Sequence, residues 1–180
     1  LKVMVAAYDI VDDTYGTAIE LPEPQTIELK LMADNDEIKA QGRLQHLLSV
    51  TTHAEFTTSF AGLPFDALAI IAGMSNSSSG TPPNGTRRAN AGAGGAGLPY
   101  FGIAGQVSAE DGADVWVGLP VCMLDAVPSW KVEQNKFFIP SASGKAIQRQ
   151  DYGKVLYLLG HQTATALIAG NFSDAFAWNT

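Results

Sequence analysis

Alternation of apolar and polar residues, with a period of two, is the feature of this sequence that most restricts its fold. Residues 26–33 read TIELKLMA, so that three aliphatic side chains fall on one side of an extended chain and Glu28 and Lys30 fall on the other. Successive side chains of a strand point to opposite faces. The pattern therefore predicts a half-buried β-strand.

The residues that follow predict the rest of a β-hairpin. Asp-Asn-Asp at 34–36 is typical of a turn, and 37–43 alternates more weakly, as a second strand. Residues 49–60 alternate again and are rich in threonine, whose β-branched side chain suits a pleated surface. Ala54, Phe56, Thr58 and Phe60 are expected to share one face of that strand, and Glu55, Thr57 and Ser59 the other.

One segment has a helical pattern. Pro64 suits the first position of a helix, where its missing N–H has no partner to lose, and Asp66 complements the helix dipole. Gly73 suits the C-terminal end. A helix this short is stable only when packed, so we place it against the sheet. The stripe expected to face the sheet consists of Phe65, Leu68, Ala69 and Ala72.

Strands are predicted again after Pro99, at 100–107, 115–124 and 126–132, and 137–139 closes this block. The stretch from residue 152 to 178 mixes apolar runs with Gly, Thr and Asn and predicts no single element type. With 180 residues the chain suits one domain. The fold class expected is mainly β, a β-sandwich or half-barrel with one short flanking helix.

Residues 75–97, SNSSSGTPPNGTRRANAGAGGAG, break the pattern and predict a long irregular loop. Ordering such a loop costs backbone entropy of roughly 1–2 kcal/mol per residue. The segment is therefore expected either to be disordered or to be ordered by a partner surface that compensates for that cost, which makes it a candidate for contacts between subunits. The candidate contact residues are Arg87, Arg88 and Asn90.

The charge of the chain restricts its partners. Charged residues make up 16% of the sequence, against roughly a quarter in typical domains, so part of the surface is expected to be covered by a partner. The net charge of -7 disfavours nucleic-acid binding but suits a surface past which nucleic acid slides. No secretory signal and no apolar run of membrane-spanning length is visible, so no membrane partner is expected.

Motifs for cofactors and metals lack their required context. The glycines at 92, 94 and 97 follow an Asn/Pro-rich stretch instead of the strand that a dinucleotide site needs. The acidic group at 34–36 has Ile38 where a calcium loop needs a ligand. His46 and His53 are seven residues apart, which puts them on opposite faces of one strand, and His161 is distant in sequence. No cofactor or metal is predicted.

No catalytic residue is predicted either. Cys122 lies in an apolar run, as a buried thiol does, with no histidine near it in sequence. Asp9, Asp12 and Asp13 are typical of a solvated turn, although paired carboxylates can also perform acid–base chemistry. We expect the chain not to be an enzyme.

Several segments, taken in order, carry a resemblance. They are 14–17 (TYGT), 32–42 (MADNDEIKAQG), 62–73 (GLPFDALAIIAG), 98–106 (LPYFGIAGQ) and 136–145 (KFFIPSASGK). In this order they resemble the major tail proteins of long-tailed (siphovirus-type) bacteriophages, which build the tail tube. The resemblance covers roughly residues 1–149, whereas the length of 75–97 and the segment from 150 onward depart from it.

The resemblance implies a structural virion protein that forms stacked hexameric rings, with the sheets of neighbouring subunits joined into an inner barrel. Its partners would be further copies of itself, tape-measure protein, and tail-tip and terminator proteins, with double-stranded DNA only in transit through the lumen. The protein would be found in the phage tail and, during assembly, in the host cytoplasm.

The resemblance favours placing the polar side of the predicted hairpin 26–43 at the lumen, although the outer surface is the other possibility. The lumen-facing candidates are Glu28, Lys30, Asp34, Asp36, Glu37, Lys39 and Gln41. Two alternative functions remain open: a secretion-system tube ring, and a carbohydrate-binding or adhesin β-sandwich with exposed aromatic residues. Trp116, Trp130 and Trp178 lie in or near apolar runs, which favours core or interface positions for them.

Overall fold

The computed structural model describes residues 1–21, 24–40, 43–60, 65–80, 86–90, 97–108, 113–126, 141–149, 154–161 and 165–176. Within them the chain is mainly β, as predicted, with two helical segments. The elements are β1 (Lys2–Asp9), β2 (Thr14–Tyr15), β3 (Ile19–Glu20), β4 (Pro24–Ala40), β5 (Arg43–Phe60), α1 (Phe65–Ala72), β6 (Ser75–Ser79), β7 (Thr86–Asn90), β8 (Phe101–Ser108), β9 (Asp114–Leu124), β10 (Ser141–Ile147), β11 (Tyr157–His161) and the 3-10 segment η1 (Ala169–Phe176).

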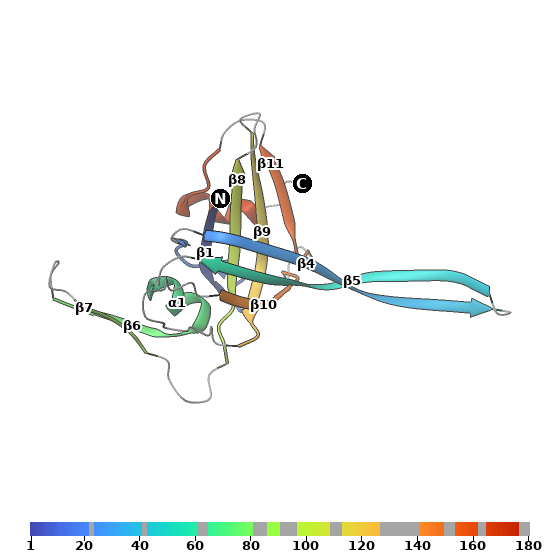
Figure 1. The fold of residues 1–180 in the computed structure, drawn as a ribbon, viewed down its shortest axis with the longest axis horizontal. Coiled ribbons are helices and arrows are strands. Elements are labelled where there is room, and N and C mark those ends of the chain that lie inside the picture. The colour runs from blue at the N-terminus through green and yellow to red at the C-terminus, as the bar shows by residue number, and fades with distance from the viewer. Residues whose placement is uncertain are drawn as a thin grey trace, which may run out of the picture.

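Nine of the described strands form one open antiparallel sheet in the order β2-β1-β8-β9-β10-β5-β4, with β3 beside β1 and β11 beside β9. One side of β9 pairs with β8 along most of its length. The other side pairs with β11 over its first half and with β10 at its end. The sheet divides there, and β4 and β5 cross the direction of β8 and β9 (Figure 1).

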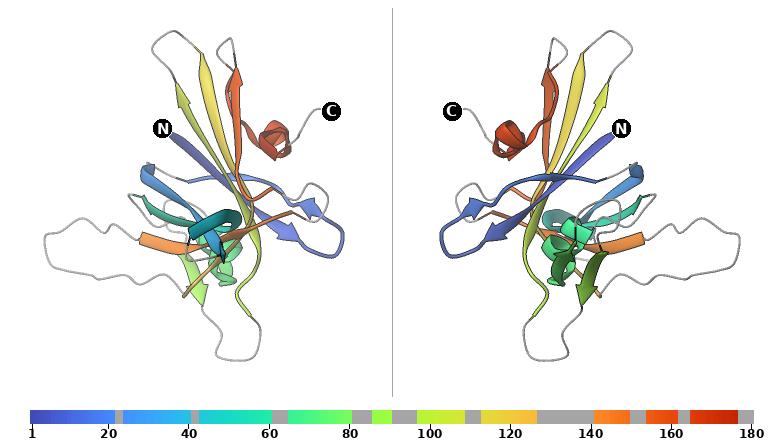
Figure 2. Two further views of the ribbon diagram at one scale, coloured as in Figure 1. Left: turned by 90° about the vertical axis from the view of Figure 1, so that its right-hand side faces the viewer. Right: turned by 90° about the vertical axis from the view of Figure 1, so that its left-hand side faces the viewer.

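The central strands β1, β8 and β9 contribute side chains to a core on each of their two faces. Val3 and Val5 of β1 join a core beneath α1, whereas Met4 and Ala6 join a second core beneath η1. Figure 2 shows the two helical segments on different sides of these strands. Strands covered on both faces need apolar residues at every position, which explains the continuous apolar runs of β1, β8 and β9.

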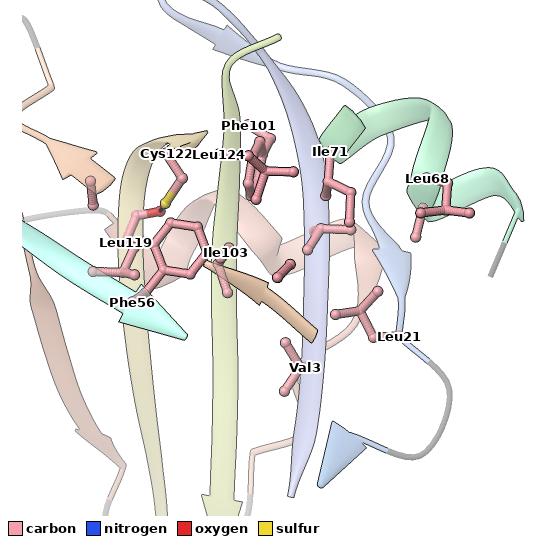
Figure 3. Close-up of a cluster of buried hydrophobic side chains, with 14 of the residues drawn as sticks. Val3, Leu21, Phe56, Leu68, Ile71, Phe101, Ile103, Leu119, Cys122 and Leu124 are labelled. Atoms are coloured by element: carbon pink, nitrogen blue, oxygen red, sulfur yellow. Dashed lines mark hydrogen bonds between the residues drawn. The ribbon is translucent and has the colours of Figure 1, made fainter. Parts of the chain in front are cut away.

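The first core is built around large side chains from several strands. Phe56 and Phe101 meet edge to face with their ring centroids 6.1 Å apart, and Leu68 and Ile71 of α1 close the core from outside (Figure 3). Cys122 is fully buried here, as predicted, and burial raises the pKa of its thiol well above the ordinary value.

Helix α1 is confirmed, but its buried stripe differs from the prediction. Ala67, Leu68 and Ile71 are buried, whereas the other expected members, Phe65, Ala69 and Ala72, are partly exposed. The segment FDALAIIA is apolar around most of its circumference, so its period does not fix the rotation, and packing against the sheet does. Gly73 ends the helix at a φ of 65°, as predicted for a C-terminal cap, and Pro64 lies outside the described residues.

The turn predicted at 34–36 is wrong, because β4 continues through it. Asp34 pairs with Val50 and Asp36 with Leu48, so the true partner strand is the whole of β5. Polar residues are tolerated at this point of β4 because Asp34 and Asn35 face water and the backbone ladder is complete without them. The shared face predicted for 49–60 is confirmed at Ala54, Phe56 and Thr58, which are all buried, and the side chain of Phe60 is not among those described.

Three further expectations are corrected. Residues 75–97 are not wholly irregular, because β6 and β7 pair as an antiparallel hairpin whose backbone ladder needs no apolar side chains. The Asn76 side chain anchors it by donating to Asp66 Oδ1 of α1 at 2.7 Å. The fold also has a second helical segment, η1, and Ala126 lies in a bend after β9 instead of in a strand.

Candidate functional site

The outer part of the β4–β5 hairpin forms an arm that extends away from the body of the molecule (Figure 1). We define the arm as the pairing of 33–40 with 43–51. Among the described residues, these two stretches pair only with each other, since β10 reaches β5 only from Ala54 onward. The described side chains of the arm are exposed, including Val50 at 51%. Nothing in the described residues covers either edge of it.

At its base, the β4–β5 hairpin lies beside β10, and the three strands together expose one face to solvent. We call this exposed face the polar face. Residues that pair directly across the three strands form rows on it. The rows are Thr26–Ser59–Ser141, Glu28–Thr57–Ser143 and Lys30–Glu55–Lys145. Their side chains are exposed or partly exposed, whereas the intervening Ala142, Gly144 and Ala146 of β10 are buried.

Close packing beneath the polar face fixes its shape. A Cβ on Gly144 would meet the carbonyl oxygen of Met123 and would lie 2.7 Å from Cζ of the Phe56 ring. On the surface, Thr26 Oγ1 and Ser59 Oγ are hydrogen-bonded at 2.7 Å. Glycine at position 144 therefore lets β10 lie close to β5 and keeps the three rows side by side.

The charges of the polar face are balanced. Glu28 and Glu55 are matched by Lys30 and Lys145, and His53 Nε2 lies 3.9 Å from Glu55 Oε1. The described side chains of this face therefore do not carry the excess negative charge of the whole chain, which is -7. The hydroxyl groups and the balanced charges make a solvent-exposed surface of low net charge.

The structure separates the predicted site residues into three places. Glu28 and Lys30 lie exposed on the polar face, and Asp34 is exposed on the arm. Positions 36, 37 and 39 follow along β4 in the arm, and position 41 lies outside the described residues. The candidate contact positions 87, 88 and 90 all lie in β7, which belongs to a separate two-stranded sheet.

Sequence reasoning missed a partly buried ionic cluster. Asp13, expected in a solvated turn, accepts a hydrogen bond from Tyr8 and one from Arg149 Nε at 2.7 Å, while Arg149 Nη2 donates to its backbone oxygen at 3.0 Å. The guanidinium also lies 5.5 Å from the Tyr15 ring centroid. Burial and the Asp13 carboxylate raise the pKa of Tyr8 to about 12. No local motif could reveal a pair 136 residues apart.

The hydrogen bonds that hold the segment 165–167 were also not predicted from the sequence. Asp114 Oδ2 accepts from the Thr165 N–H at 2.5 Å, and Gln106 Oε1 accepts from the Leu167 N–H at 2.8 Å. Although burial acts to raise the pKa of Asp114, the Thr165 N–H and the Ser108 and Gln106 side chains hold it below the ordinary value. This network secures the chain that leads into η1.

The described residues show no arrangement for metal chemistry. No group of three His, Cys, Asp or Glu residues among them could hold a metal ion. His53 lies beside Glu55, and His161 packs on Trp116 with ring centroids 4.4 Å apart. The side chain of His46 is not among those described.

No described helix is both long and apolar enough to cross a bilayer. The chain matched none of the protein-family models in a scan, and a search of curated proteins gave no significant match. The candidate functional site is therefore defined by geometry, as the arm and the polar face at its base.

Proposed function

We propose that this chain is a self-assembling structural subunit of a long-tailed bacteriophage tail tube, forming hexameric rings that stack around a DNA-conducting lumen. The observation that carries the proposal is the arm. Strands of 17 and 18 residues continue past the core, where each pairs only with the other among the described residues. A two-stranded ribbon is marginally stable in water by itself. An arm of this length is best explained by contacts with another copy.

The open sheet supports the same proposal. In the described residues β4 is the last strand of the sheet, and its outer edge has no strand partner. Exposed edges favour aggregation unless they are covered, and closing a ring covers them. In the proposed assembly each subunit is a half-barrel or sandwich that joins its neighbours, and the hydrated polar face lines the lumen.

The structure fits the two alternative functions to different degrees. A secretion-system tube ring would use the same arm and open edge. A carbohydrate-binding β-sandwich needs an exposed aromatic platform, but Trp116 is 1% exposed and Phe101 and Phe176 are buried. Trp130 and Trp178 lie outside the described residues. The described aromatic residues therefore favour an assembly protein over a glycan-binding module.

The proposal is tested by sedimentation and negative-stain microscopy of the purified chain, together with an arm-shortened variant. Residues 34–50 are replaced by Asn-Gly, which joins Ala33 to Thr51, a directly paired position suited to a two-residue turn. Wild type should form rings or tubes, whereas the variant should stay monomeric and folded. A wild type that remains monomeric at high concentration would exclude the proposed function.

The position of the polar face is tested separately. Glu28→Cys in a Cys122→Ser background is treated with a thiol reagent too bulky for the lumen. Intact tubes should label slowly and dissociated subunits rapidly. Rapid labelling of intact tubes would place this face on the outside.

A further inference from the structure

The polar face carries a row of charges that alternate in sign across three strands. Lys30 lies directly opposite Glu55, and Glu55 lies directly opposite Lys145 on its other side. Both lysines are exposed, and the Glu55 side chain is 42% exposed. Directly opposed residues of neighbouring strands hold their Cβ atoms about 4.5–5.5 Å apart. Glu55 is therefore flanked by one lysine on each neighbouring strand, and His53 Nε2 lies 3.9 Å from its Oε1 atom.

The range of electrostatic forces makes this row more important than the net charge of the chain. At physiological salt, charges beyond about 8–10 Å are largely screened. A phosphate that approaches the polar face therefore interacts mainly with the few charges of that face. Exposed lysines attract phosphates, and the chain's overall charge of -7 gives little protection at this distance.

We propose that Glu55 is the residue that keeps this face from binding nucleic acid, because its carboxylate neutralises Lys30 and Lys145. The biological meaning rests on the proposed function, in which DNA must pass along the face without adhering. The physical effect is a property of the single chain, since the row is complete within one subunit and exposed in it.

The experiment measures the affinity of the unassembled full-length chain for a short DNA duplex by fluorescence anisotropy. Glu55→Gln should bind at least about fivefold more tightly than wild type at about 50 mM salt. Release of two lysines should steepen the dependence of log affinity on log salt by about 1 to 2. Adding Lys145→Gln to Glu55→Gln should remove most of the gain, and circular dichroism verifies that each variant is folded.

Glu28→Gln is the matched control, because it removes the same charge from the same face. Directly opposite Glu28 lies Thr57, with Ser143 beyond it, and only Lys30, two residues along β4, is a neighbouring lysine on this face, so this variant should gain no more than about twofold. Equal gains in the two variants would show that overall charge matters and would overturn the proposal, as would no gain in Glu55→Gln.

Tube formation is scored separately by microscopy. Tubes without a gain in DNA affinity would remove this inference and leave the proposed function, whereas a gain without tubes would do the reverse.

Discussion

The body and the arm of this molecule are both built from long antiparallel strands, yet their strands depend on different surroundings. In the body, Val3 and Val5 face one core while Met4 and Ala6 face another, so β1 is buried on both sides. In the arm, the described side chains face water. Burial contributes roughly 25 cal/mol per Å² of apolar surface, and the arm gains little of this within one chain. Its order must come from the body at its base and, in the proposed assembly, from other copies.

The largest loss of stability is expected when a large side chain is removed from the core of the body. Phe101→Ala deletes a ring that is 1% exposed and packs against Phe56. It should lower the free energy of unfolding by about 3–5 kcal/mol, measured by urea denaturation of the unassembled chain. The matched control is Val50→Ala in the arm. A loss below about 1 kcal/mol for Phe101→Ala would mean that the first core is not the main source of stability.

The next largest loss of stability is expected when the ion pair between Asp13 and Arg149, which we call the clamp, is disrupted. Their side chains are 14% and 15% exposed, and Arg149→Met removes the guanidinium that contacts the Asp13 carboxylate. Loss of one partner from a fully buried pair costs about 3–5 kcal/mol. Because this pair retains some solvent contact, we expect a loss nearer 2–3 kcal/mol in the free energy of unfolding. A double variant with Asp13→Asn should cost less than the sum of the two single changes, and strict additivity would contradict the clamp.

The same contrast explains what the sequence could predict. Alternation identified the base of β4 and the buried side of β5, because Ile27 and Leu29 pack against the first core and Phe56 lies within it. On β4 the pattern fails at Leu31, which is 52% exposed. The helix was also identified, since Gly73 marks its end. In the arm, the described side chains are exposed on both faces, so no alternation is required there. The polar residues at 34–36 were therefore mistaken for a turn.

Register and long-range pairing could not be predicted. Glu28 and Lys30 were found as members of a wet face, but Glu55 and Lys145 join them only through the pairing of β5 with both β4 and β10. The Arg149–Asp13 pair likewise depends on how the sheet closes. The rotation of α1 was decided by packing against the sheet, because its sequence is apolar on most sides.

A smaller effect on stability, which depends on pH, is expected from the hydrogen bond between Asp114 and the backbone of Thr165. Because the folded pKa of Asp114 is held below its ordinary value, its stabilising contribution is present above that value, near pH 4, and is lost as the pH falls through the folded pKa. Asp114→Asn should be less stable than wild type at neutral pH, and the gap should narrow on acidification. Amide hydrogen exchange at Thr165 should accelerate in the variant. The exposed Asp174→Asn is the control, and stability curves that stay parallel would contradict this role.

The smallest change in the free energy of unfolding of the single chain is expected for a substitution in the arm. This substitution also tests directly whether the arm depends on other copies and the body does not. Val50→Thr keeps a β-branched side chain of similar size, so it preserves the preference for a strand and removes only apolar character. Because Val50 is 51% exposed, the free energy of unfolding of the unassembled chain should change by no more than about 0.5 kcal/mol. Assembly should nevertheless slow, measured by light scattering, since the same side chain is buried when another copy covers the arm. A destabilisation above about 1 kcal/mol in the unassembled chain would mean that the arm packs against its own body. The distinction between the two regions would then fail, and with it the main support for assembly through the arm.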